Sequence, residues 1–97
     1  MAKKVNITEK LSFDENPVIV IKDKEFEVNA DAKTMLEILG AFNNKSEIEA
    51  SLLAYEKMFS EKDREKIDEM NLSFKDFMTV IEFGITLIQG DDDPGEQ

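Results

Sequence analysis

The chain has no cysteine and no histidine among its 97 residues. Without cysteine there can be no disulfide bond, thiolate metal site or cysteine nucleophile. Without histidine the chain lacks the commonest general base, the commonest metal ligand and the usual serine-protease triad. Glycine-rich phosphate-binding loops and the hydrolase and metalloprotease motifs are also missing. These absences predict a protein that is not an enzyme and that holds no metal or cofactor.

Long apolar segments are missing as well. The longest aliphatic run is Val18–Ile21, whereas a membrane-spanning helix needs roughly 20 apolar residues. The opening Met1–Lys4 leads directly into polar residues, unlike the apolar core of a secretory signal peptide. We therefore expect a protein of the cytoplasm that has no membrane partner.

Negative charge dominates the composition. Twelve basic residues face 22 acidic ones, which gives a formal net charge of −10. Nine of the ten excess negative charges lie from Asn29 onward. Such a surface repels nucleic acid and anionic membranes, so neither is expected as a partner.

The length and the hydrophobic fraction of 41% are typical of one small domain. We place this domain at residues 1–90. Residues 91–97 carry four acidic side chains and no apolar one. Such a segment cannot offset its ordering entropy by burial, so it is predicted to be a disordered acidic tail.

The pattern of residues 17–28 predicts a β-hairpin, because a β-branched run is followed by a short polar stretch and a second apolar segment. A two-residue turn at Asp23 and Lys24 would pair Ile21 with Phe26. Val18 and Val20 would then point away from the core. Four apolar side chains would share the core face: Ile19, Ile21, Phe26 and Val28.

Helical patterns follow the hairpin, at about residues 30–42, 46–59, 61–70 and 73–89. Asn29 or Asp31 can cap the first helix. The other three each begin with a serine that has an acidic residue three positions later, which is a capping signature: Ser46, Ser60 and Ser73. The predicted fold class is α+β, mainly α, with an N-terminal β-hairpin followed by a bundle of about four helices.

Helical spacing also predicts which side chains form the core. On the first helix these are Met35, Leu36, Leu39 and Phe42, on the second Ile48, Leu52, Tyr55 and Phe59, and on the third Ile67 and Met70.

The last helix is apolar on two adjoining sides. An ordinary core stripe consists of Phe74, Phe77, Met78, Ile81, Ile85 and Ile88. A second stripe consists of Val80, Phe83, Gly84 and Leu87. Either the domain itself wraps the helix on both sides, or the second stripe meets another chain. Gly84 supports a close approach by another element, since glycine inside a helix costs roughly 1 kcal/mol relative to alanine. We regard the second stripe as a candidate partner interface and expect a homo-oligomer.

Four segments of the chain give a resemblance to a known family: Asn6–Leu11, Phe26–Ala32, Asn71–Phe77 and the acidic Gly90–Glu96. Together they resemble the small tail assembly chaperones of long-tailed phages and prophages of Gram-positive bacteria. The resemblance implies a non-enzymatic protein of the host cytoplasm that coats a hydrophobic helical segment of the tape measure protein and keeps it soluble. It also implies the tail tube protein as a partner, which a longer frameshifted product binds.

Two other functions stay open on the residues alone. An acidic protein could inhibit a nucleic-acid enzyme by imitating DNA, although the acidic residues would then have to follow one face in order. A small regulatory adaptor is the other alternative, because nothing in the sequence distinguishes its docking surface from that of a chaperone.

Overall fold

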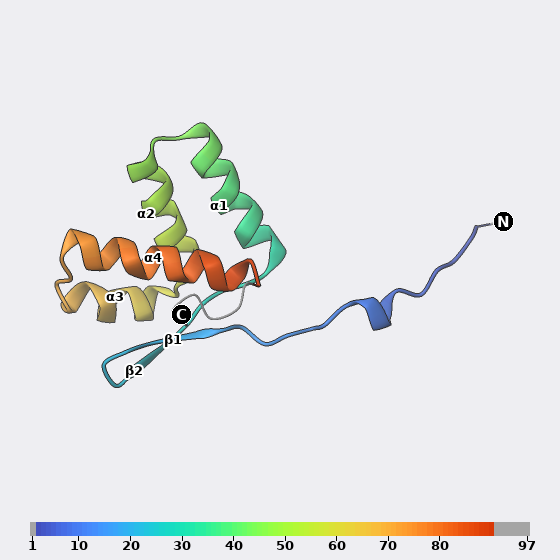
Figure 1. The fold of residues 1–97 in the computed structure, drawn as a ribbon, viewed down its shortest axis with the longest axis horizontal. Coiled ribbons are helices and arrows are strands. Elements are labelled where there is room, and N and C mark those ends of the chain that lie inside the picture. Colours follow the sequence, from blue (N-terminus) through green and yellow to red (C-terminus); the bar gives the residue numbers. More distant parts are fainter. Residues whose placement is uncertain (1, 91–97) are drawn as a thin grey trace, which may run out of the picture.

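The computed structural model describes residues 2–90, so the tail predicted at 91–97 lies outside the described residues. The fold is α+β and mainly α, as predicted, with one antiparallel hairpin before four helices (Figure 1). The elements are β1 (Val18–Ile21), β2 (Lys24–Glu27), α1 (Ala32–Asn44), α2 (Glu47–Met58), α3 (Glu61–Glu69) and α4 (Phe74–Ile88).

All four helices begin at the predicted caps. Asp31 rather than Asn29 caps α1, and its carboxylate accepts hydrogen bonds from the Thr34 amide at 3.2 Å and the Thr34 hydroxyl at 2.8 Å. These bonds stabilise the carboxylate and lower the pKa of Asp31. Each predicted serine accepts a bond from a backbone amide three residues later: Ser46 from Glu49, Ser60 from Asp63 and Ser73 from Asp76.

The hairpin has the predicted faces but a different register. Its turn lies at Lys22 and Asp23, so Phe26 pairs with Ile19, and the predicted pairing with Ile21 is wrong. At the first position of this turn Lys22 adopts a φ of 56°, a conformation that lysine rarely takes. The register differs from the prediction by two residues, and side chains alternate between the faces of a strand with a period of two, so every side chain stays on its predicted face. Phe26 is accordingly buried, Ile19 and Ile21 are half-buried, and Val18 and Val20 are exposed.

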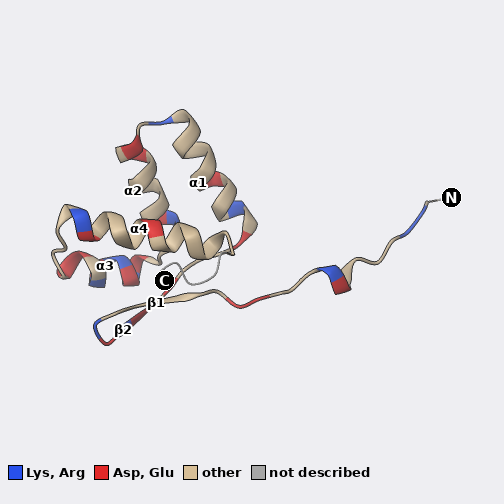
Figure 2. Ribbon diagram, viewed as in Figure 1, with Lys and Arg blue, Asp and Glu red and all other residues tan. Residues whose placement is uncertain are grey.

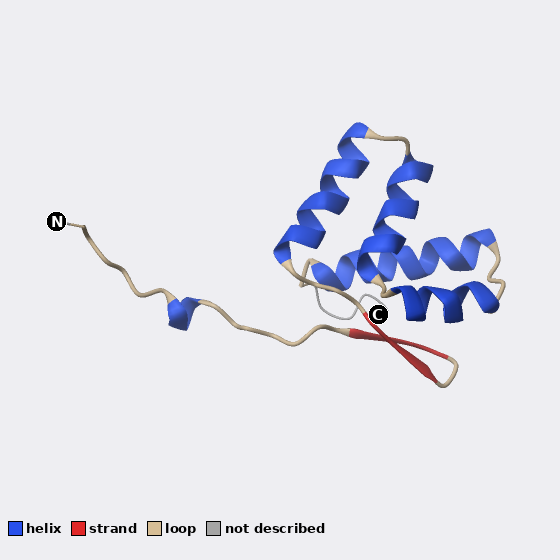
Figure 3. Cartoon of the chain, turned by 180° about the vertical axis from the view of Figure 1, so that it is seen from behind, coloured by secondary structure: helices blue, strands red, loops and turns tan. Residues whose placement is uncertain are grey.

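The core lies where the C-terminal end of α2 meets α3, α4 and the hairpin. Figures 1 and 3 show α1 beside α2, with α3 and α4 crossing the lower end of α2. The Asn29 amide donates to the carbonyl of Met58 at 2.8 Å, which ties the end of β2 to the end of α2. The buried cluster is apolar throughout, apart from one hydroxyl: Phe26, Val28, Ile38, Ala54, Tyr55, Met58, Phe59, Ile67 and Ile81.

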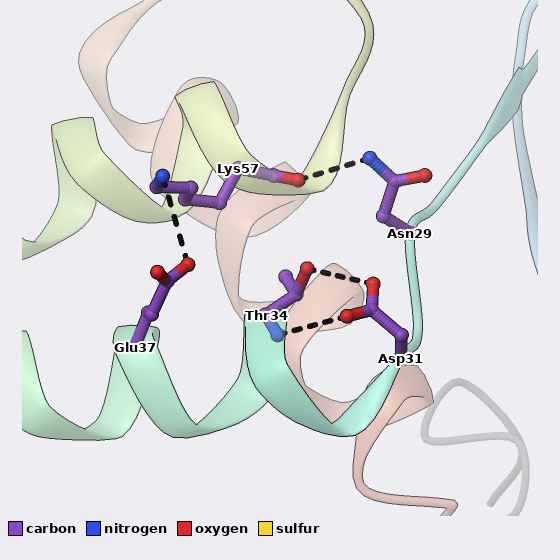
Figure 4. Close-up of polar contacts among 5 residues, drawn as sticks. All are labelled: Asn29, Asp31, Thr34, Glu37 and Lys57. Atoms are coloured by element: carbon purple, nitrogen blue, oxygen red, sulfur yellow. Dashed lines mark hydrogen bonds and ion pairs between the residues drawn. The ribbon is translucent and has the colours of Figure 1, made fainter.

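Polar contacts hold the start of α1 against the end of α2 (Figure 4). The Asn29 side chain donates to the Lys57 carbonyl at 3.1 Å, and the Lys57 ammonium lies 3.6 Å from the Glu37 carboxylate. Both charged side chains are nearly half exposed, so the ion pair contributes little to stability. The orientation of the connection between β2 and α1 rests more on the hydrogen bonds of Asn29.

The predicted core faces of α1 and α2 are partly wrong. Leu36 on α1 is 68% exposed, and Thr34, Ile38 and Ala41 are the buried residues of that helix. On α2, Tyr55 and the adjoining Phe59 are buried as predicted. Four further apolar side chains of the predicted faces are exposed, Leu39 and Phe42 on α1 and Ile48 and Leu52 on α2. The reason is that α1 packs mainly on α2, and this contact buries only a narrow stripe of each helix.

The first part of the chain extends away from the body as an arm (Figure 1). We call residues 2–16 the N-terminal arm; it contains one three-residue 3-10 turn, Thr8–Lys10, with no buried residue. The arm gives the molecule a longest dimension of 59 Å. None of the helices in residues 2–90 is long and apolar enough to cross a membrane.

Candidate functional site

The two apolar sides of α4 border two separate grooves. The first, the hairpin–α4 groove, has a volume of about 390 Å³ and lies between β1 and the second stripe. Three of the four predicted interface residues line it, namely Val80, Phe83 and Leu87. Phe83 is 36% exposed and the other two are half-buried. The structure therefore brings these three side chains together on an accessible surface.

Gly84 is buried and does not line this groove. A Cβ atom built at this position would lie 2.7 Å from the Met58 sulfur and 3.0 Å from the Met58 terminal methyl. Glycine therefore permits the close approach that the sequence suggested, and the approaching element is α2 of the same chain.

A second groove, which the sequence did not predict, lies between α2 and α4. This α2–α4 groove has a volume of about 480 Å³. Its large apolar side chains were all assigned to core faces from their spacing, yet Ile48 is 70%, Leu52 51% and Phe74 78% exposed. Phe77 and Met78 complete its apolar lining. The buried residues of α2 include Ala50, Ala54, Tyr55 and Met58, so the packed side of that helix is not the side that carries Ile48 and Leu52.

Two polar features distinguish the α2–α4 groove from a simple apolar surface. Ser51 lines it, and the Ser51 hydroxyl is buried without a hydrogen-bond partner among the described protein atoms. A buried hydroxyl without a partner costs free energy, so a bound ligand with a polar atom would be favoured there. Glu47 and Glu82 add negative charge to the lining. The groove therefore suits an apolar partner that also carries basic side chains.

The buried tyrosine has a structural role. The Tyr55 hydroxyl lies 2.7 Å from the Asp68 carboxylate and 2.9 Å from the Arg64 carbonyl, and thereby joins α2 to α3. Burial, followed by the bond to Asp68, raises the pKa of Tyr55, so the hydroxyl stays protonated. In the part of the chain that the structure describes, no three acidic side chains lie close enough together to hold a metal ion.

Comparison with known proteins found no matching family model, no similar curated protein and no similar solved structure.

Proposed function

We propose that this protein is a non-enzymatic assembly chaperone that binds a hydrophobic helical segment of a phage tape measure protein in the α2–α4 groove. The observation that carries the proposal is the exposure of Ile48, Leu52 and Phe74 around one groove of about 480 Å³. Clustered apolar side chains on a small domain mark a protein interaction site. The sequence resemblance supplies the identity of the partner and the setting, the host cytoplasm during tail assembly.

The shape of the groove supports a helical partner. Two helices form its walls, and an amphipathic helix can lay its apolar face into such a groove with anchors at spacings of three and four residues. Glu47 and Glu82 would meet basic side chains beside these anchors. The net charge of −10 would keep the complex in solution while the tail tube protein assembles around the tape measure protein.

The charge distribution gives the DNA-mimic alternative no support. Mimicry needs carboxylates arrayed along one face, whereas Figure 2 shows acidic and basic segments alternating along α3. A regulatory adaptor would use the same apolar groove. Identification of the bound helix would therefore separate an adaptor from a chaperone.

The test is co-expression with a phage tape measure protein. The wild-type protein should keep that product in the soluble fraction, and Leu52→Glu should lose this effect, because a charge in the groove opposes burial of the partner. Leu36→Glu is the matched control, since Leu36 is 68% exposed on α1 and does not line the groove.

Circular dichroism should show both variants folded, because neither position is in the core. Equal solubilisation by both variants would overturn the groove as the binding site. Failure of the wild-type protein to solubilise the co-expressed tape measure protein would overturn the proposed function.

A further inference from the structure

The N-terminal arm has the alternation of a β-strand with one buried face. Its large apolar residues occupy odd positions only: Val5, Ile7, Leu11 and Phe13. The even positions from 4 to 12 are polar, and Glu9 is the one break on the apolar side. All four apolar side chains are at least 50% exposed. A period-two apolar pattern is favourable only when another surface covers it.

One edge of β1 is unpaired in the described part of the chain. The sheet has two strands, and the Val28 amide donates to the Pro17 carbonyl at 2.9 Å. Because hydrogen-bonded and non-bonded pairs alternate in an antiparallel ladder, the backbone groups of Ile19 and Ile21 point toward β2. Those of Val18 and Val20 therefore point away from β2, as an open edge that can accept another strand.

This open edge borders the hairpin–α4 groove. All four consecutive residues of β1 line the groove, together with Val80, Phe83 and Leu87 of α4. Side chains of a strand alternate between its faces, so a groove that touches all four runs along the edge of the strand rather than across one face. A strand added there would gain main-chain hydrogen bonds from β1 and an apolar wall from α4.

We propose that the N-terminal arm of one copy adds to β1 of a second copy, with its odd-numbered apolar side chains in the hairpin–α4 groove. Reciprocal exchange between two copies gives a closed dimer. The three-residue turn at Thr8–Lys10 opens when the arm docks, at small cost because such a short turn has little stability of its own. This inference goes beyond the proposed chaperone function and does not depend on it.

The charge distribution favours the arm of a second copy as the segment that occupies the groove. Residues 2–13 contain three lysines and one glutamate, a net charge of +2, whereas the rest of the chain contains nine basic and 21 acidic residues, a net charge of −12. Residues 2–13, the outer part of the arm, are thus a basic segment of an acidic molecule, whereas Asp14 and Glu15 at its root bring the net charge of the whole arm to zero. The attraction of this outer part to a second copy offsets part of the repulsion between two acidic bodies.

The position of the arm favours docking in the groove of a second copy over docking in the groove of its own chain. The Asn16 side chain donates to Glu27 at 2.7 Å and accepts from the Ala30 amide at 3.2 Å, which holds the root of the arm in line with β1. From this point the arm runs away from the helices in both views (Figures 1 and 3). Docking on its own β1 would require the chain to reverse within Asp14 and Glu15.

The test is sedimentation of the full chain over a wide concentration range. The wild-type protein should be a dimer, and Leu11→Glu should weaken dimerisation by roughly tenfold or more, because it places a charge among apolar side chains. Ser12→Glu makes the same charge change on the polar side of the arm and should dimerise as the wild type does. A monomeric wild type, or equal dimerisation of Leu11→Glu and Ser12→Glu, would overturn the proposal.

Two substitutions in the hairpin–α4 groove, which would receive the arm, complete the test. Val20→Pro removes an edge amide that makes no bond to β2 and should abolish dimerisation, whereas Val20→Thr keeps this amide and should not. Phe83→Glu should also abolish dimerisation. The Phe83 side chain is accessible enough for the substituted monomer to stay folded. A dimer that persists in folded Val20→Pro would contradict strand addition. None of these measurements involves a tape measure protein, so the two proposals fail separately.

Discussion

At the scale of single residues, the two glycines inside helices, Gly84 and Gly40, have different surroundings. Both lie inside helices, where glycine costs roughly 1 kcal/mol relative to alanine. A Cβ at Gly84 would lie 2.7 Å from the sulfur of Met58, which is fully buried, whereas a Cβ at Gly40 would meet nothing within 4 Å. Only at Gly84 would an added Cβ displace a neighbouring side chain.

We therefore expect opposite effects from the same substitution. Gly84→Ala should lower the free energy of unfolding by about 1 kcal/mol, since overpacking costs about 1–3 kcal/mol and the gain in helix propensity offsets only part of it. Gly40→Ala, the matched control, should raise the free energy of unfolding by up to about 1 kcal/mol. Urea denaturation measures both. Equal stabilisation by the two changes would mean that Met58 rearranges freely and that the packing argument is wrong.

At the scale of elements, the predictions that succeeded depended on short-range contacts. Ser46, Ser60 and Ser73 were predicted as caps because the bond that each makes spans only three residues. The faces of the hairpin were predictable because alternation fixes them, whatever the register. The turn position was not, because Lys22 takes a positive φ that sequence preferences assign to glycine or asparagine.

The candidate site was predictable only in part, for a related reason. Helical spacing identifies an apolar stripe but does not show which neighbour covers it. Phe83 was found because α4 has more apolar width than one core face needs, whereas Ile48 and Leu52 looked like ordinary core residues. The α2–α4 groove depends on the way that α1 and α4 pack against α2, and no local pattern encodes this arrangement.

The hairpin turn offers a prediction at this scale. Lys22→Gly should raise the free energy of unfolding by about 0.5–1 kcal/mol, because glycine relieves a left-handed conformation costing roughly 1–2 kcal/mol but loses more entropy on folding. Lys22 is exposed, so the change removes no packing. Asp23→Gly is the control, since Asp23 has no positive φ, and it should not stabilise the protein. Thermal unfolding followed by circular dichroism measures both, and a destabilised Lys22→Gly would contradict the assigned turn.

At the scale of the whole molecule, α4 separates two surfaces that share no residue. The α2–α4 groove is lined by Phe74, Phe77 and Met78, and the hairpin–α4 groove by Val80, Phe83 and Leu87. Figure 1 shows α2 and the hairpin on different sides of α4. One copy can therefore hold the arm of a second copy and a partner helix at the same time.

This separation predicts that the two binding events are independent. A helical peptide taken from a tape measure protein should bind Phe83→Glu and the wild type with affinities that agree within about twofold, since the two grooves share no lining residue and sites without shared partners act nearly additively. Calorimetry should give one peptide per chain in both proteins. Leu52→Glu provides the reciprocal control, because it should lose the peptide and still sediment as a dimer. Loss of peptide binding in folded Phe83→Glu would show instead that the helix occupies the hairpin–α4 groove, so that the arm and the partner compete for one surface.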